Sequence, residues 1–155
     1  MKEIATFNTL VWAWIVVAII TFIILLFITA PYGRHSSGKW GISIPNRFGW
    51  MLMELPALVI FLVFVITGSS EKSAAVWVIT ALFAIHYTNR SIIFPLRIRT
   101  KGKEMPLVIA LMAIMFNTIN ASFLGYYTGT LQTMYSADWL TDPRFITGLI
   151  LFLTG

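Results

Sequence analysis

The chain has 155 residues, of which 58% are hydrophobic and only 11% are charged, and its mean hydropathy is +0.83. Because soluble domains carry about 25% charged residues, this composition excludes a soluble globular protein. The chain has no cysteine, which excludes a disulfide framework, a thiolate nucleophile and a thiolate metal site. The net charge of +5 falls in short segments between apolar runs. This placement indicates membrane topology and not nucleic-acid binding.

Several apolar runs are long enough to cross a hydrocarbon layer of roughly 30 Å, which needs about 20 helical residues. In chain order they are residues 9–30, 48–67, 74–96 and 106–128. Glu54 and Arg90 are the only residues with a formal charge inside them. A fifth run, 145–155, covers only about 16 Å, so we expect an incomplete helix and a piece of a longer chain. The predicted fold is an all-α integral membrane protein, a single transmembrane bundle over 1–155 with about five helices.

Basic residues gather in alternate connections between these runs. The first connection and its flank hold Arg34, Lys39 and Arg47, and the third holds Arg97, Arg99, Lys101 and Lys103, against only Lys72 in the second and Arg144 in the fourth. The positive-inside rule therefore puts segments 31–47 and 97–105 in the cytoplasm and the amino terminus outside. The first run is too long for a secretory signal and lacks a cleavage pattern, so we expect a retained helix.

Ionisable side chains inside the runs are the informative residues. Each costs roughly 2.5 to 3.5 kcal/mol at the centre of a membrane helix, so it should face a partner or a wet cavity. Glu54 lies roughly 10 Å below the cytoplasmic end of its helix, and on the antiparallel third helix Arg90 and Tyr87 lie roughly 10 and 15 Å deep. Helical spacing puts His86 and Tyr87 on nearly the same face as Arg90. We expect these four side chains to form one cluster.

Two interpretations of this cluster stay open from the residues alone. In the structural one, Glu54 and Arg90 form an ion pair between helices, and His86 and Tyr87 bond backbone carbonyls. In the functional one, a carboxyl in low dielectric stays partly protonated and, with a phenol, supplies two donors that polarise a carbonyl. Trp50 shares a helix face with Glu54 at spacing i, i+4.

Amides on the fourth run also admit two roles. Asn117 and Asn120 would either line the same cavity or bond between helices, as amides commonly do in membranes. The two histidines are 51 positions apart and no Walker loop, H-E-x-x-H or G-x-G-x-x-G motif is present. We therefore predict no metal site.

A series of short motifs between residues 31 and 155 resembles the membrane steroid 5α-reductase family. The motifs are Pro31-Tyr32-Gly33-Arg34-His35, Ile44-Pro45-Asn46-Arg47, Glu54-Leu55-Pro56, His86-Tyr87 with Arg90, Gly125-Tyr126-Tyr127, and Asp138-Trp139 with Thr141-Asp142. The resemblance implies a seven-helix enzyme that uses NADPH to reduce the 4,5 double bond of a 3-oxo-4-ene steroid, or of a similar lipophilic enone, that enters from the bilayer.

The resemblance also implies roles for individual residues. Glu54 and Tyr87 would polarise the 3-oxo group, because hydride arriving at the β-carbon of an enone leaves negative charge on the carbonyl oxygen. Trp50, Met53 and Asn120 would contact the substrate. His86 and Arg90 would support the site, and Lys101 and Lys103 would meet NADPH phosphates unless they serve only as topology charges.

Some features depart from the family. Met53 stands where members often have Gln, Met112 stands where some carry Arg, and the family's later half, with its cofactor region, lies outside these 155 residues. Alternatives are another membrane sterol reductase or methyltransferase of related fold, or a proton or solute path through the bundle. We expect membrane lipid as a partner, no metal and no nucleic acid, and a bacterial homologue, in the bacterial inner membrane or in the endoplasmic reticulum.

Overall fold

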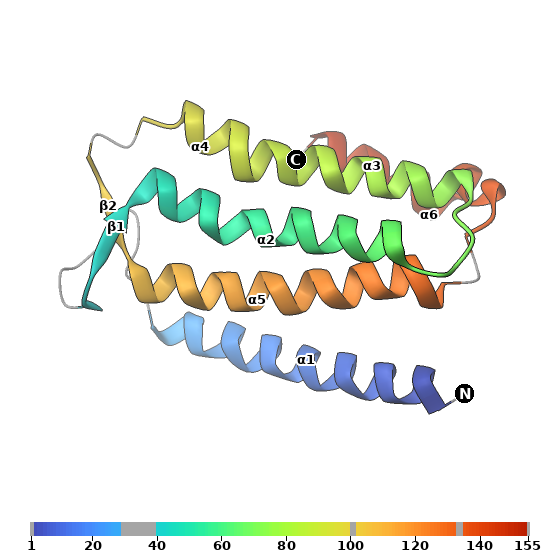
Figure 1. The fold of residues 1–155 in the computed structure, drawn as a ribbon, viewed down its shortest axis with the longest axis horizontal. Helices are drawn as coiled ribbons and strands as arrows, with labels where there is room; N and C mark the ends of the chain where they lie inside the picture. Colours follow the sequence, from blue (N-terminus) through green and yellow to red (C-terminus); the bar gives the residue numbers. More distant parts are fainter. Residues whose placement is uncertain (1, 29–39, 100–101, 133–134, 155) are drawn as a thin grey trace.

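A computed structural model of the chain describes residues 2–28, 40–99, 102–132 and 135–154. It is a bundle of helices lying side by side, capped at one end by a short ribbon of two strands (Figure 1). The elements are α1 (Lys2–Phe27), β1 (Ser43–Pro45), α2 (Asn46–Thr67), α3 (Ala74–Thr88), the π-helix η3 (Asn89–Ile93), α4 (Phe94–Arg97), β2 (Glu104–Pro106), α5 (Leu107–Tyr126), the π-helix η4 (Tyr127–Leu131), the 3-10 helix η5 (Ala137–Thr141) and α6 (Pro143–Thr154). The predicted helical membrane bundle is confirmed.

Three helices of the described chain are long and apolar enough to cross a membrane: α1, α2 and the combined helix 107–131. The predicted span 74–96 is helical from 74 to 97 through α3, η3 and α4, but its polar stretch from His86 to Ser91 lowers its hydropathy. As a membrane span it stays a prediction. The first helix begins at Lys2, seven residues before the predicted run at 9, because helical propensity continues beyond the purely apolar stretch.

The centre of the bundle is the contact between α2 and α5, where small residues let two backbones approach closely. Ala121, Gly125 and Gly129 follow one another at four-residue spacing on this face, and all three are buried. A Cβ added at Gly125 would lie 2.8 Å from the Cβ of Phe64, so a larger residue could not fit there. Small residues at this spacing are typical of membrane helix pairs, which gain stability from close van der Waals packing.

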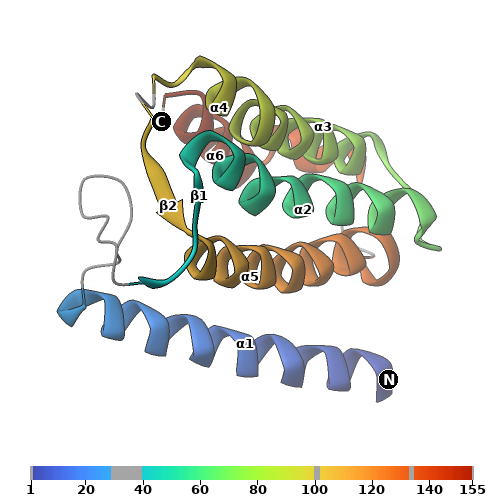
Figure 2. The same cartoon turned by 60° about the vertical axis from the view of Figure 1, so that its left-hand side comes forward.

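A ribbon of two short strands joins the connections that the sequence predicts to be cytoplasmic. β1 and β2 pair antiparallel, with Ser43 opposite Pro106 and Ile44 opposite Met105 (Figure 2). Strands of three residues carry too little periodicity to be predicted from sequence. The pairing brings the described parts of segments 31–47 and 97–105 to the same end of the bundle, as the charge pattern requires.

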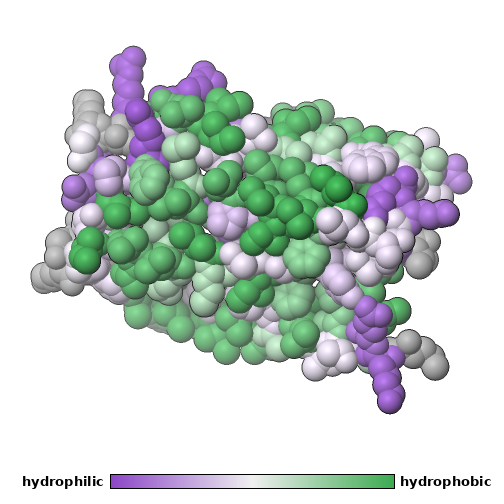
Figure 3. Space-filling model, viewed as in Figure 1, coloured by the Kyte–Doolittle hydropathy of each residue, from purple (hydrophilic) through white to green (hydrophobic). Residues whose placement is uncertain are grey.

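Helix α1 lies along α5 and contributes no buried residue to the core. Its contacts are mainly aromatic: Phe7 packs edge-to-face on Phe123 at 5.8 Å between ring centroids, and Trp14 lies 5.2 Å from Phe116. On the face drawn in Figure 3, apolar residues cover the middle of the bundle and hydrophilic residues gather toward its two ends. This is the distribution that a bilayer requires.

Candidate active site

The buried acid on α2 pairs with the arginine of the third helical segment. Glu54 is 5% exposed, and its Oε1 lies 2.7 Å from Nε of Arg90. Pro56 is inside the same helix, so the carbonyl two residues before Glu54 lacks its usual helical N–H donor. The 2.7 Å distance between Glu54 and Arg90 is the ion pair that the structural interpretation expects. The Arg90 side chain is 46% exposed, so only one partner of the pair is fully desolvated.

Aromatic rings enclose the exposed side of this pair. The Arg90 guanidinium carbon lies 5.5 Å from the centroid of the Trp50 ring, and Trp50 meets Phe94 edge-on at 6.1 Å. Trp50 and Glu54 thus lie on one face of α2 and both contact Arg90, as their four-residue spacing predicts. A cation above an indole face gains electrostatic energy, and more so where water is scarce.

The predicted phenol lies on the same helix as Arg90, one turn away. The Tyr87 ring packs against Phe83 at 4.5 Å, and Phe83 stacks on Phe61 of the core at 3.9 Å. Tyr87 also packs against the buried cluster that includes Ala57 and Phe61 of α2, the helix that carries Glu54. The side chain is half-buried, so this packing fixes its ring between the two helices. The structure therefore brings the predicted acid, phenol and arginine into one region.

A π-helical turn, which the sequence analysis did not predict, carries Arg90. Segment η3 spans Asn89–Ile93, and the N–H of Phe94 donates to the carbonyl of Asn89. Pro95 follows at once; its ring has no N–H and would clash with a helical carbonyl four residues earlier, so a wider turn relieves the conflict. The Ser91 hydroxyl donates to the Tyr87 carbonyl at 2.6 Å. π-turns in helices are frequent at functional sites.

The remaining predicted residues occupy three different environments. His86 is exposed, with its ring 5.1 Å from Tyr87 and 5.8 Å from Phe152 of α6. Met53 is buried in a cluster with Met105 and Ala110, on the side of α2 that faces α5. Asn120 is half-buried on α5. Substrate contact by Trp50, Met53 and Asn120 stays a prediction.

Asn117 has the interhelical role that the sequence left open. Its Nδ2 donates to the backbone carbonyl of Met53 at 2.6 Å, one residue before Glu54. The bond fixes α5 against α2 at the level of the buried acid. A polar side chain that satisfies a backbone carbonyl between membrane helices is a common stabilising contact.

The basic end of the bundle is built on the ribbon. Lys103 is exposed, and its carbonyl accepts the N–H of Asn46 at 3.0 Å, while Nη2 of Arg47 donates to the carbonyl of Ile98 at 3.2 Å. These bonds bring Lys103 beside the first turn of α2. Lys101 lies outside the described residues. Lysine and arginine side chains suit phosphate groups, so the donors present here fit a nucleotide cofactor.

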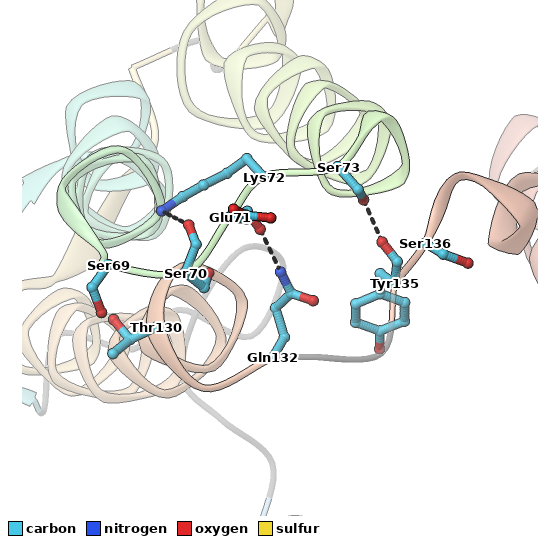
Figure 4. A pocket seen from close by; sticks show the side chains of 9 residues that line it. All are labelled: Ser69, Ser70, Glu71, Lys72, Ser73, Thr130, Gln132, Tyr135 and Ser136. Atoms are coloured by element: carbon cyan, nitrogen blue, oxygen red, sulfur yellow. Dashed lines mark hydrogen bonds between the residues drawn. The ribbon is translucent and has the colours of Figure 1, made fainter.

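The opposite end of the bundle holds a polar pocket. The pocket has a volume of about 610 Å³ and is lined by Ser69, Ser70, Glu71, Lys72, Ser73, Thr130, Gln132, Tyr135 and Ser136 (Figure 4). Lys72 Nζ donates to the carbonyls of Gly68, Ser70 and Gly129. Because a lysine bonded to backbone carbonyls has no sequence signature, nothing in the pattern could have predicted this arrangement.

Within the described part of the chain, no group of three or more His, Asp or Glu side chains could hold a metal ion. The fold and site together define a helical membrane protein in which a buried carboxylate pairs with a half-exposed guanidinium, one helical turn from a phenol. This constellation can hold and polarise an oxygen-bearing ligand in a low-dielectric environment.

Comparison with known proteins identifies the family. Residues 103–155 match the family model described as 3-oxo-5-alpha-steroid 4-dehydrogenase. The chain is 36% identical over 141 residues to 3-oxo-5-alpha-steroid 4-dehydrogenase 1 of Bos taurus, covering 88% of this chain and 54% of that protein. It is 39% identical to the Homo sapiens protein of the same name over 126 residues (80% and 48%), and 34% identical to steroid 5-alpha-reductase DET2 of Solanum lycopersicum over 152 residues (96% and 59%).

The chain belongs to the steroid 5α-reductase family. It spans about half the length of the curated relatives it matches. The resemblance predicted from short motifs is confirmed at the level of the family.

Proposed function

We propose that the whole protein is an oxidoreductase that reduces the 4,5 double bond of a 3-oxo-4-ene steroid, or of a similar lipophilic enone, with NADPH. The relatives' names describe this kind of activity. The observation that carries the proposal is the buried Glu54, bound to Arg90 at 2.7 Å, with Tyr87 one turn from Arg90 on the same helix. Such a group in a membrane helix is costly, so a functional role explains its presence.

In this proposal Tyr87 is the donor to the 3-oxo group. Glu54 accepts from Arg90 and so holds the guanidinium in place, while the single O–H of Tyr87 is kept for the 3-oxo oxygen. NADPH, when bound, supplies hydride to the β-carbon of the enone. As negative charge moves to the carbonyl oxygen, a phenol O–H already directed at that oxygen strengthens its hydrogen bond and lowers the barrier. A proton then completes the reduction at the α-carbon.

Other residues of the chain contribute binding. Trp50 would form one wall of the steroid site and hold Arg90 in place. His86 would adjust the Tyr87 ring from the α6 side. Lys101 and Lys103, with Arg47 nearby, would bind the phosphates of NADPH from the cytoplasmic side, with the amino terminus outside. Phosphate groups attract such cations from solution, so this binding should weaken as salt increases.

The test is steroid-dependent NADPH oxidation by the purified full-length protein. Glu54→Gln and Tyr87→Phe should each lower turnover by about 100-fold, the usual scale for removal of one electrostatic donor or its orienting group. The matched controls are Glu3→Gln and Tyr126→Phe, because Glu3 and Tyr126 are also hydrogen-bonded to each other, at the junction of α1 and α5. Both controls should oxidise NADPH at the wild-type rate. Equal rates in all four variants would exclude Glu54 and Tyr87 from the reaction.

A further inference from the structure

Tyr135 lines the polar pocket (Figure 4) and also an apolar groove beside it. The groove has a volume of about 350 Å³ and lies between α3 and α6, with Ile79 and Leu82 on one side and Phe145, Leu149 and Phe152 on the other. Trp139 and Arg144 also line it. A ligand that fills both spaces needs a polar head and an apolar tail.

The cations that line these two spaces are already engaged. Lys72 directs its ammonium at three backbone carbonyls, and an ammonium has only three N–H donors. Arg144 binds Asp142 through two parallel bonds, Nε to Oδ1 at 2.9 Å and Nη2 to Oδ2 at 2.8 Å, and lies over Trp139 at 4.6 Å. An anionic head group would therefore have to break an existing pair. The charge that lines the polar pocket and faces solvent is the carboxylate of Glu71.

The neutral groups of the pocket supply both donors and acceptors. Gln132 is 5% exposed, and its Nε2 donates to the backbone carbonyl of Glu71 at 3.1 Å, which leaves its side-chain oxygen as an acceptor. The hydroxyls of Ser69, Thr130 and Ser136 also line the pocket. Hydroxyl donors suit a phosphodiester, whereas the carboxylate and the amide oxygen suit an ammonium.

We propose that this pocket and groove bind a phospholipid whose head group carries an ammonium, such as phosphatidylethanolamine. The head lies among the hydroxyls with its ammonium at Glu71, and one acyl chain lies in the groove between α3 and α6. Tyr135 and Trp139 pack against each other at 5.3 Å where the two spaces meet. Aromatic side chains of this kind concentrate at the level of lipid head groups, which is where such a ligand would be held.

The experiment is native mass spectrometry of the full-length protein, delipidated and then offered phosphatidylethanolamine or phosphatidylglycerol with identical acyl chains. Wild type should retain the ethanolamine lipid about fivefold better, the scale of one charge interaction near a membrane surface. Glu71→Gln removes the carboxylate without removing the backbone carbonyl that Gln132 binds, and should abolish the preference. Glu71 is exposed, so this variant should keep its melting temperature.

A second variant tests the groove. Gly148 lines the groove and a Cβ added there meets no atom within 4 Å, so Gly148→Leu introduces an apolar side chain at the groove with open space around its Cβ. This variant should lose retention of both lipids, whereas Leu151→Phe, an exposed residue of the same helix, should not. Equal retention of the two lipids by wild type would overturn the head-group assignment. Unchanged retention in Gly148→Leu would show that the acyl chain lies elsewhere and would overturn the proposal.

Discussion

The ion pair between Glu54 and Arg90 gives a quantitative prediction about stability. Replacing Arg90 with Met keeps most of the side-chain volume but leaves the carboxylate of Glu54, 5% exposed, without its partner. Removing one member of a fully buried pair costs about 3 to 5 kcal/mol, and exposed pairs contribute about 0 to 1 kcal/mol. Because Glu54 is buried and Arg90 is half exposed, we expect Arg90→Met to lower the free energy of unfolding by about 2 kcal/mol.

The double variant Glu54→Gln with Arg90→Met separates two costs: the loss of the ion pair and the burial of an unpaired charge. Glu54→Gln removes the charge, so Arg90→Met added to Glu54→Gln should cost much less than it does in wild type. The expected coupling is about 1 to 2 kcal/mol, measured by reversible denaturation of the four proteins in one detergent. If the destabilisation of the double variant equals the sum of the two single variants, Glu54 and Arg90 do not interact as their 2.7 Å contact implies.

Further predictions concern packing, pH and topology. Gly125→Leu should prevent folding because its Cβ would lie 2.8 Å from a neighbouring Cβ, whereas Gly148→Leu should fold normally; equal expression of folded protein would refute the packing account. The side-chain hydrogen bond from its arginine partner lowers the pKa of Asp142 to about 2, below the unfolded value near 3.8. The stability from this pair is present above pH 4 and is lost as the pH falls toward 2. Asp142→Asn should therefore make the melting temperature depend less on pH between 4 and 2. An unchanged pH dependence would contradict this prediction. Since these 155 residues hold no cysteine, single cysteines at Ser136 and Lys103 should react with impermeant thiol reagents from opposite sides of the membrane; labelling from one side would refute the predicted orientation.

Much of the site could be predicted because it depends on depth along helices. Residue spacing at about 1.5 Å per residue puts Glu54 and Arg90 at similar depths on antiparallel neighbours, and the structure pairs them. The same arithmetic could not choose between an ion pair and a protonated acid. That choice depends on the rotation of the helices, which packing at Gly125 and Gly129 and the π-turn before Pro95 determine.

Other features depend on contacts that the sequence pattern does not encode. The ribbon depends on backbone hydrogen bonds between three-residue strands. The polar pocket depends in part on a bond from Lys72 to the carbonyl of Gly129, far away in the sequence. Neither has hydrophobic periodicity. The small residues at the contact with α2 are visible in the sequence as Gly125 of α5 and Gly129 of η4, at the four-residue spacing typical of close helix pairs.

The central claim is that Tyr87, oriented beside Glu54, donates a hydrogen bond to the carbonyl of the bound enone. Vibrational difference spectroscopy of the full-length protein with a 3-oxo-4-ene steroid labelled with carbon-13 at the carbonyl measures this bond directly. The account predicts a carbonyl stretch at lower frequency in wild type than in Tyr87→Phe, with the wild-type value kept in Tyr126→Phe. An identical frequency in wild type and Tyr87→Phe would contradict it.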